Sequence, residues 1–228
     1  LCFAANLVAE VRFIAEGLYY AITGTNTVEI YHGEMTAFNN DLIIPETVTW
    51  GGQTYTVTSI RAYTFQNWSS ITSVTIPKSV ISIGSGAFAG CSSLTSVAIP
   101  ESVISIGERA FATTALYNNY MNWEDDVLYI DNCLIAAKTS ITDSYTIKQH
   151  TRIIGGGAFR NCTKLTSLTL PNGITSISTY AFYGCTALQS INIPSSVISI
   201  ETKSFFNTSI YNTASNWENG GLYIDNCL

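Results

Sequence analysis

Ile71-Thr-Ser-Val-Thr-Ile-Pro77 decides the fold, because the chain repeats this stretch three more times. The other copies are Leu94-Thr-Ser-Val-Ala-Ile-Pro100, Leu165-Thr-Ser-Leu-Thr-Leu-Pro171 and Leu188-Gln-Ser-Ile-Asn-Ile-Pro194. The first two copies lie 23 residues apart (94 − 71), and so do the last two (188 − 165). Self-similarity at a fixed period of about 20–50 residues is the signature of a repeat protein whose units stack on one another.

Each copy continues into a second pattern. Ser79-Val-Ile-Ser-Ile-Gly84 is followed by Ala87-Phe88 and then by Cys91. Two degenerate copies run over residues 42–70 and 141–164. One repeat position holds all five prolines of the chain: Pro45, Pro77, Pro100, Pro171 and Pro194. Another position holds three of the six cysteines: Cys91, Cys162 and Cys185. Such regular placement excludes a chance resemblance between the copies.

The repeat predicts a coil with two short strands. Leu-x-x-Val-x-Ile points three side chains inward, and proline ends the strand because it cannot donate to a continuing ladder. Val80 and Ile83 begin a second inward-facing strand. Gly86-Ala87-Phe88-Ala89 is too short for a stable helix, so we expect one helical turn with its phenylalanine in the core. The fold class is therefore a β-rich leucine-rich-repeat solenoid, horseshoe-like, with parallel strands on two faces, single helical turns and inserted β-hairpins.

A longer period lies over the short one. Asn122–Leu134 returns as Asn216–Leu228 at an offset of 94, which is also the offset between Ile71 and Leu165. A block of two repeats and a hairpin has thus been duplicated, and we expect a longer natural protein or a domain cut from one. Leu1–Ala5 is open to two interpretations, the tail of a signal peptide or an ordinary strand.

The domain organisation follows from these periods. We expect a capping hairpin segment over residues 1–40, since the first coil needs its open edge covered. Residues 41–228 form the solenoid, in one continuous domain with the cap. Hairpins interrupt it near residues 48–57, 117–137 and 211–228, where turn residues such as Gly51-Gly52 and Asp131-Asn132 separate alternating strands.

Composition excludes several classes of partner. Only 11% of the 228 residues are charged, the net charge is −6 and the pI is about 4.8. No basic block exists to neutralise phosphates, which argues against nucleic acid and against an anionic membrane surface. No run of eighteen apolar residues occurs, so we expect no membrane-spanning segment.

The cysteines allow two interpretations. Cys162 and Cys185 lie in neighbouring coils, within reach of a disulfide. The alternative, which we favour, is a buried ladder of small side chains, because Trp68, Thr114 and Thr208 fill the same slot in other coils.

Catalytic, metal and cofactor sites find little support. His32 and His150 lie in no nucleophile or metal signature, and no Cys-x-x-Cys occurs. Glu124-Asp125-Asp126 suggests calcium, but its spacing matches no known loop, and a solvated turn is the better interpretation. We therefore expect no enzyme, no metal and no cofactor. Three glycosylation-like sequons begin at one coil corner, and their first residues are expected to be turn-capping asparagines: Asn67, Asn161 and Asn207.

Two sets of outward residues are the candidate binding positions. The slot after the inward valine is polar in half of the coils, so it should face solvent, where isoleucines would form exposed apolar positions: Ile81, Ile104 and Ile198. A solvated strand with ordinary β-propensity is the alternative. The outward face of the first strand is polar and uncharged, which suits protein or carbohydrate contacts: Thr72, Thr75, Thr95, Thr166 and Thr169.

The consensus Leu-Thr-Ser-Val-x-Ile-Pro-x-Ser-Val-x-Ser-Ile-Gly-x-x-Ala-Phe-x-x-Cys-Ser-Ser resembles the BspA-like leucine-rich repeat of bacterial surface and secreted proteins. The resemblance covers roughly residues 17 to 228. It implies a cell-surface or secreted bacterial protein, an adhesive role towards a host or bacterial protein or glycan, and no family-wide catalytic residues. A structural spacer in a longer surface protein is the alternative, and an accessory domain of an enzyme is a remote one.

Overall fold

One repeat folds into one coil with three sides. In the coil that begins at Ile71, the first side is β7 (Ser73–Thr75) and the second is β8 (Ser82–Ile83). Ile71, Val74 and Ile76 are buried, while Thr72 and Thr75 between them are exposed, which confirms the predicted alternation. The computed structural model describes residues 10–34, 40–218 and 221–222. Leu1–Ala5 lies outside the described residues, so both interpretations of this stretch stay open. Cys2 and Cys227 also lie outside the described residues.

The first sides of the coils pair in parallel in two small sheets. One sheet has the order β4 (Asp41–Ile43), β7 and β9 (Ser96–Ala98). The other has the order β14 (Thr142–Thr146), β16 (Lys164–Thr169) and β18 (Ser190–Asn192). Equivalent residues stand opposite one another, as Val74 does to Val97 and Leu168 to Ile191. The inward side chains of successive coils therefore stack in columns, which is what a constant repeat length requires.

The second sides form two larger sheets, each extended by hairpins. The first contains β1 (Arg12–Ala15), β2 (Leu18–Gly24), β3 (Thr27–Gly33), β6 (Gln53–Ile60), β8 and β10 (Ser105–Ile106), with β5 (Thr47–Trp50) paired to β6. The second contains β11 (Trp123–Glu124), β12 (Val127–Ile130), β13 (Cys133–Ala137), β15 (Ile153–Ile154), β17 (Ser176–Ile177) and β19 (Ser199–Ile200). Since β3 pairs in parallel with β6 and β13 with β15, a hairpin strand starts the parallel ladder each time.

The third side is a run of turns, and the helical turn predicted at Gly86–Ala89 is wrong. We call this side the turn face; it comprises residues 61–68, 84–91, 107–114, 155–162, 178–185 and 201–208. Alternate amides here donate to the next coil, as Phe65 N does to Ala87 O (2.8 Å) and Phe88 N to Ala110 O (2.8 Å). Two residues per coil have positive φ: Tyr63 and Asn67, Gly86 and Gly90, Arg109 and Thr113, Gly157 and Asn161, Tyr180 and Gly184, Lys203 and Asn207. These left-handed residues aim every second amide at the neighbouring coil, so a helix cannot form.

Each block ends in one true helical turn. These are α1 (Ala115–Asn118) and α2 (Ser209–Asn212), followed by the 3₁₀ turns η2 (Tyr120–Asn122) and η3 (Ala214–Asn216). Thr114 and Thr208 cap α1 and α2 by accepting from the amides of Tyr117 (3.1 Å) and Tyr211 (3.0 Å). After α2 the described part of the predicted 211–228 hairpin contains β20 (Trp217–Glu218) and β21 (Gly221–Leu222).

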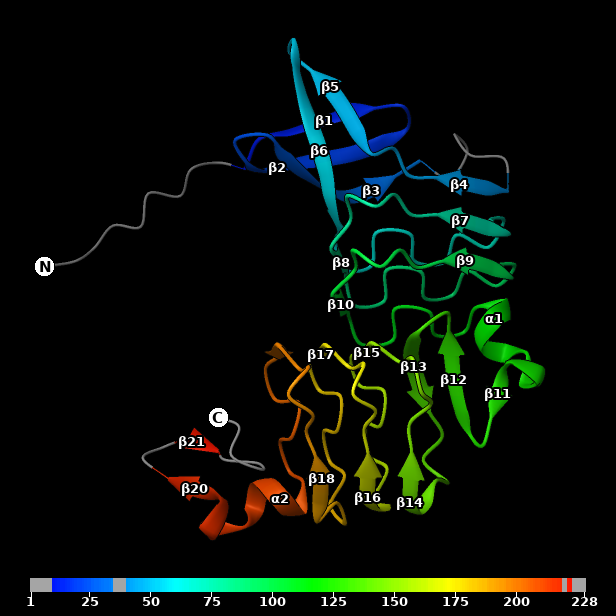
Figure 1. Cartoon of the computed structure of the whole chain (residues 1–228). Helices are drawn as coiled ribbons and strands as arrows, with labels where there is room; N and C mark the ends of the chain where they lie inside the picture. The colour runs from blue at the N-terminus through cyan, green and yellow to red at the C-terminus, as the bar shows by residue number, and fades with distance from the viewer. Residues whose placement is uncertain (1–9, 35–39, 219–220, 223–228) are drawn as a thin grey trace, which may run out of the picture.

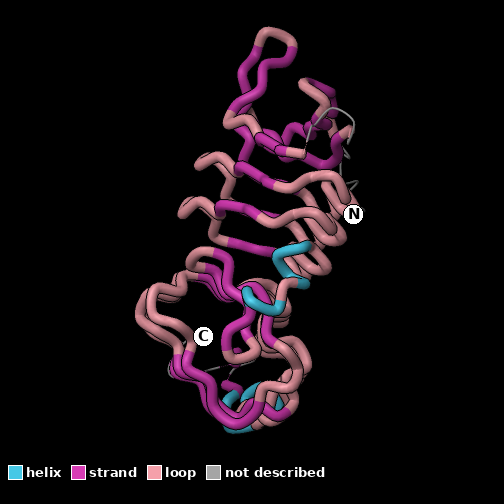
Figure 2. The backbone as a smooth tube through the Cα atoms, turned by 90° about the vertical axis from the view of Figure 1, so that its right-hand side faces the viewer, coloured by secondary structure: helices cyan, strands magenta, loops and turns pink. Residues whose placement is uncertain are grey.

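The coils stack in two arrays that follow different directions (Figure 1). The first array continues from the capping strands to β10, and the second runs from β13 to β19 across the end of the first. Figure 2 looks along the second array, whose coils overlay one another, while the coils of the first are seen in succession. We call the bend between the arrays the elbow. Within the described ranges, no helix has the length and apolar character needed to cross a membrane.

Candidate functional site

The isoleucine slot faces solvent in three coils. Ile81 is 47% exposed, Ile104 48% and Ile198 82%. Ile81 and Ile104 are neighbours, since Ile104 N donates to Ile81 O (2.9 Å). Ile198 lies in the second array, where its amide donates to Thr175 O (2.9 Å). The structure thus joins only the first two into one apolar surface, which we call the isoleucine pair (Ile81 and Ile104).

The five threonines are all exposed, on two separate sheets. Thr72, Thr75 and Thr95 lie on or beside β7 and β9 in the first array. Thr166 and Thr169 lie on β16 in the second. Because the elbow separates the two sheets, these residues form two short polar strips and not one continuous surface.

Side chains and backbone of the second array hold the elbow. The Arg152 guanidinium reaches back to the first array and donates to Pro100 O (2.7 Å) and to Val103 O. The Asp131 carboxylate accepts from Ile99 N at 2.8 Å. Gly156 N donates to Ile106 O at 2.7 Å. Arg152 occupies the same slot as the exposed isoleucines, so one repeat position serves as solvent face in some coils and as array contact in another.

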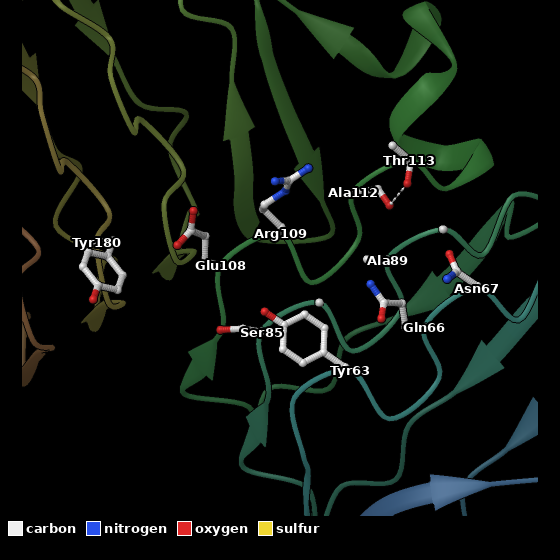
Figure 3. Close-up of a pocket in the computed structure, with 12 residues that line it drawn as sticks. Tyr63, Gln66, Asn67, Ser85, Ala89, Glu108, Arg109, Ala112, Thr113 and Tyr180 are labelled. Atoms are coloured by element: carbon white, nitrogen blue, oxygen red, sulfur yellow. Dashed lines mark hydrogen bonds between the residues drawn. The ribbon is translucent and has the colours of Figure 1, made fainter.

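A hollow of about 560 Å³ lies on the turn face at the elbow. Its walls come from both arrays: Tyr63, Gln66, Asn67, Glu108 and Arg109 from the first, and Tyr180 from the second (Figure 3). An adjoining hollow of about 440 Å³ shares Glu108 and Arg109 and extends to Arg160. We call the two together the elbow groove. The sequence contained one signal for it, since a single repeat slot places Tyr63, Arg109 and Tyr180 on the turn face, but only the bend brings them to one cavity.

The cysteine slot is a buried ladder, as favoured from the sequence. Cys91, Cys162 and Cys185 are fully buried and free, as is Cys133. Cys91 Sγ donates to Phe65 O (3.1 Å) and Cys185 Sγ to Phe159 O (2.9 Å), each a carbonyl of the preceding coil. A small side chain with a hydrogen-bond donor suits this slot, and threonine replaces cysteine where a capped helical turn must begin.

We predict that these thiols react slowly in the native protein. Burial raises the pKa of Cys91 to about 11 and the pKa values of Cys133, Cys162 and Cys185 to about 12. Near pH 8 the thiolate fraction should fall at least about a hundredfold below that of an unfolded chain. Since the folded pKa values are raised, the stability from neutral thiols is complete below about pH 8.5 and is lost towards pH 11–12.

Iodoacetamide labelling mapped by mass spectrometry tests this site by site, with the urea-unfolded chain as reference. Native labelling of Cys162 or Cys185 at the unfolded rate, or a Cys162–Cys185 disulfide in the native protein, would contradict the buried-ladder interpretation.

The acidic stretch near residue 125 is a hairpin turn. Asp125 and Asp126 both have positive φ, between β11 and β12. The Asp126 carboxylate binds Lys138 Nζ (2.8 Å) and Ser140 Oγ (2.8 Å), and the hydrogen bond from Lys138 lowers its pKa. Both oxygens of the Asp126 carboxylate are therefore already engaged by side chains of the same hairpin. The described residues contain no cluster of three metal-ligating side chains.

The remaining sequence candidates lie on turns and strands. His32 is exposed on β3, edge-on to Tyr19 with ring centroids 5.1 Å apart. His150 is exposed at a turn with a φ of 71°. The three sequon asparagines are the second left-handed residue of their coils, with φ near 60° (62°, 59° and 59°), so they are turn residues of the repeat.

Comparison with known families gives one match. The model described as the BspA type leucine rich repeat region matches residues 58–145 and 136–220, in six copies. No curated protein matches the chain.

Several solved structures resemble this one. A leucine-rich repeat protein from Bacteroides ovatus is 24% identical over 86% of this chain, with a TM-score of 0.44. A leucine rich cell surface protein from Faecalibacterium prausnitzii is 28% identical over 86% of this chain, with a TM-score of 0.48. A leucine-rich repeat protein of T. pallidum is 23% identical; the match covers 83% of this chain and 86% of that one, with a TM-score of 0.47. The chain spans 57% and 52% of the lengths of the first two.

Proposed function

The chain belongs to the BspA-type leucine-rich repeat family, and from this premise we propose that it is a non-catalytic, adhesion-type protein-binding module. It would act in a bacterial cell-surface or secreted protein and present the solenoid surface to a protein or glycan partner of the host or of another bacterium. Its acidic charge, with a net value of −6, disfavours nucleic acid as that partner.

The observation that carries this proposal is the isoleucine pair. Two large aliphatic side chains, each about half exposed (47% and 48%), stand on adjacent coils held by a backbone hydrogen bond. A rigid ladder presents them with little conformational freedom left to lose on binding, which favours an apolar anchor for a partner protein. The polar threonine strip of β7 and β9 lies on the other sheet of the same array and would supply further polar contacts.

A spacer function is the alternative. A solenoid whose coils contact only their neighbours serves equally as a rigid rod between other domains. Such a rod needs no exposed apolar pair, and its surface should bind nothing.

Binding of the chain to immobilised extracellular-matrix proteins, measured by surface plasmon resonance, tests the proposal. The variant Ile81→Lys/Ile104→Lys should lose about 30-fold in affinity, since apolar anchors of this kind contribute about 2 kcal/mol or more. Its far-UV circular dichroism should be unchanged, because both side chains already face water.

Ile43→Lys is the matched control, since Ile43 is 66% exposed but lies on β4 in the other sheet. Thr72→Lys/Thr95→Lys places the same two charges on adjacent coils of the threonine strip. If only the threonine variant loses binding, the contact surface is the strip; if the unmodified chain binds none of these proteins, the spacer function replaces the proposal.

A further inference from the structure

Arg109 is an unpaired cation in the elbow groove. Its side chain is exposed and makes no hydrogen bond or ion pair with any other residue that the structure describes. The neighbouring carboxylate is already neutralised, because Glu108 accepts two hydrogen bonds from Arg160 Nη1, both at 2.9 Å. The charged residues that line the two hollows are Glu108, Arg109 and Arg160. Because Glu108 and Arg160 pair with each other, Arg109 leaves the lining with a net charge of +1, in a chain whose net charge is −6.

Tyr63 lines the same hollow as this cation and exposes part of its aromatic ring. The Cδ1–Cε1 edge of the ring lies against Gly86, where an added Cβ would come within 2.6 Å of both atoms. The residue is 60% exposed, so much of the ring remains open to the hollow and to solvent. Figure 3 shows Arg109 above Tyr63 in this view, and Tyr180 at the left, beyond Glu108. The Tyr180 ring packs edge-to-face against the Tyr183 ring, with centroids 5.5 Å apart.

The lining distinguishes between classes of ligand. Around the first hollow the walls contain tyrosine, amide, hydroxyl and charged side chains with glycine and alanine, and no leucine, isoleucine, valine, methionine or phenylalanine. A peptide gains most of its affinity by placing apolar side chains in sockets, which this hollow lacks. A sugar has hydroxyl groups that hydrogen-bond to side-chain amides, and a C–H face that stacks on an aromatic ring. The volume of about 560 Å³ is within the range of small-ligand sites, about 300–1,000 Å³.

We propose that the first hollow of the elbow groove, the one lined by Tyr63 and Arg109, binds an acidic carbohydrate, a glycan segment whose sugar ring stacks on Tyr63 and whose carboxylate pairs with Arg109. The planar guanidinium donates two parallel hydrogen bonds to such a carboxylate. Gln66 and Asn67, on the same wall, supply donors and acceptors to the hydroxyl groups. The groove lies on the turn face and the isoleucine pair on a strand face, so this site is independent of the protein-binding function proposed above.

Isothermal titration calorimetry with tetragalacturonate and with a tetramer of sialic acid tests the site, since the two probes present the same carboxylate on different sugars. We expect at least one to bind with a Kd of about 1 mM or tighter. Arg109→Gln should weaken that binding about tenfold, the loss of a charge-assisted pair. Tyr63→Asn, which tolerates the positive φ, should weaken it about fivefold through the lost ring contact.

Lys78→Gln is the matched control, because Lys78 is exposed on the turn after Pro77 and outside the groove. It should leave the Kd unchanged, and methyl-esterified tetragalacturonate should bind at least tenfold more weakly than the free acid. The proposal is overturned if neither probe binds, if Lys78→Gln weakens binding as much as Arg109→Gln, or if tetraglutamate binds as tightly as the sugars. Loss of protein binding in the Ile81→Lys/Ile104→Lys variant leaves these titrations unaffected, so the two proposals fail separately.

Discussion

Replacing Phe182 with alanine should lower the free energy of unfolding by about 3–5 kcal/mol, the usual cost of deleting a fully buried aromatic ring. Phe182 has no exposed surface and stacks between Phe159 and Phe205, with ring centroids 5.6 Å and 5.1 Å away. Each coil depends on its neighbours for a buried core, so the cavity weakens both interfaces of this coil. Urea unfolding followed by circular dichroism measures the change.

Phe206→Ala is the control for this prediction. Phe206 also contacts two rings, Tyr183 at 5.5 Å and Tyr211 at 5.0 Å, but it is 37% exposed on the turn face. Its removal should cost about 1–3 kcal/mol and less than that of Phe182, since each of its two aromatic pairs contributes about 0.5–1.5 kcal/mol and the ring is partly exposed. Equal losses in the two variants would mean that the phenylalanine column is not the core of the second array.

Replacing Gly156 with alanine should destabilise the elbow by about 1–3 kcal/mol or more. An added Cβ would lie 2.5 Å from Glu108 N and 3.0 Å from Ile106 O, both backbone atoms of the first array. Backbone cannot rotate away as a side chain tip can, so the arrays must separate. The Gly156 N to Ile106 O hydrogen bond (2.7 Å) would be stretched or lost with them.

Small-angle X-ray scattering should detect this change as an altered maximum dimension, and urea unfolding should detect the lost stability. Gly173→Ala is the matched control, because its Cβ would meet only Thr151 O at an ordinary 3.5 Å. That variant should stay within about 0.5 kcal/mol of the unmodified chain and keep its scattering profile. An unchanged profile and stability for Gly156→Ala would refute the close contact at the elbow.

The coil could be predicted from the sequence because its determinants are local. Alternation along Ile71–Pro77 places side chains on two faces of a strand, and a period of 23 residues stacks equivalent positions. The cysteine ladder could be predicted because one repeat position holds cysteine in one coil (Cys91) and threonine in another (Thr114). The exposure of Ile81 and Ile104 followed from polar residues in equivalent coils.

The turn face could not be predicted in the same way. A helical turn satisfies the pattern of Gly86–Ala89 equally well when one coil is considered alone. Only a neighbouring coil offers carbonyls such as Ala110 O to the amides, and these intercoil hydrogen bonds select left-handed residues over a helix. The division of the chain at residue 40 stays a prediction, as do the residues assigned to binding.

The sequence by itself determined the solenoid, the inward and outward faces of its strands and the duplication of a 94-residue block. Tertiary structure alone decided the elbow, and with it the groove between Tyr63, Arg109 and Tyr180. The reason is physical. The elbow rests on backbone acceptors, Pro100 O and Ile106 O, which pair with residues about fifty positions further along the chain. Every residue has such a carbonyl, so no pattern of side chains reveals which ones will be used.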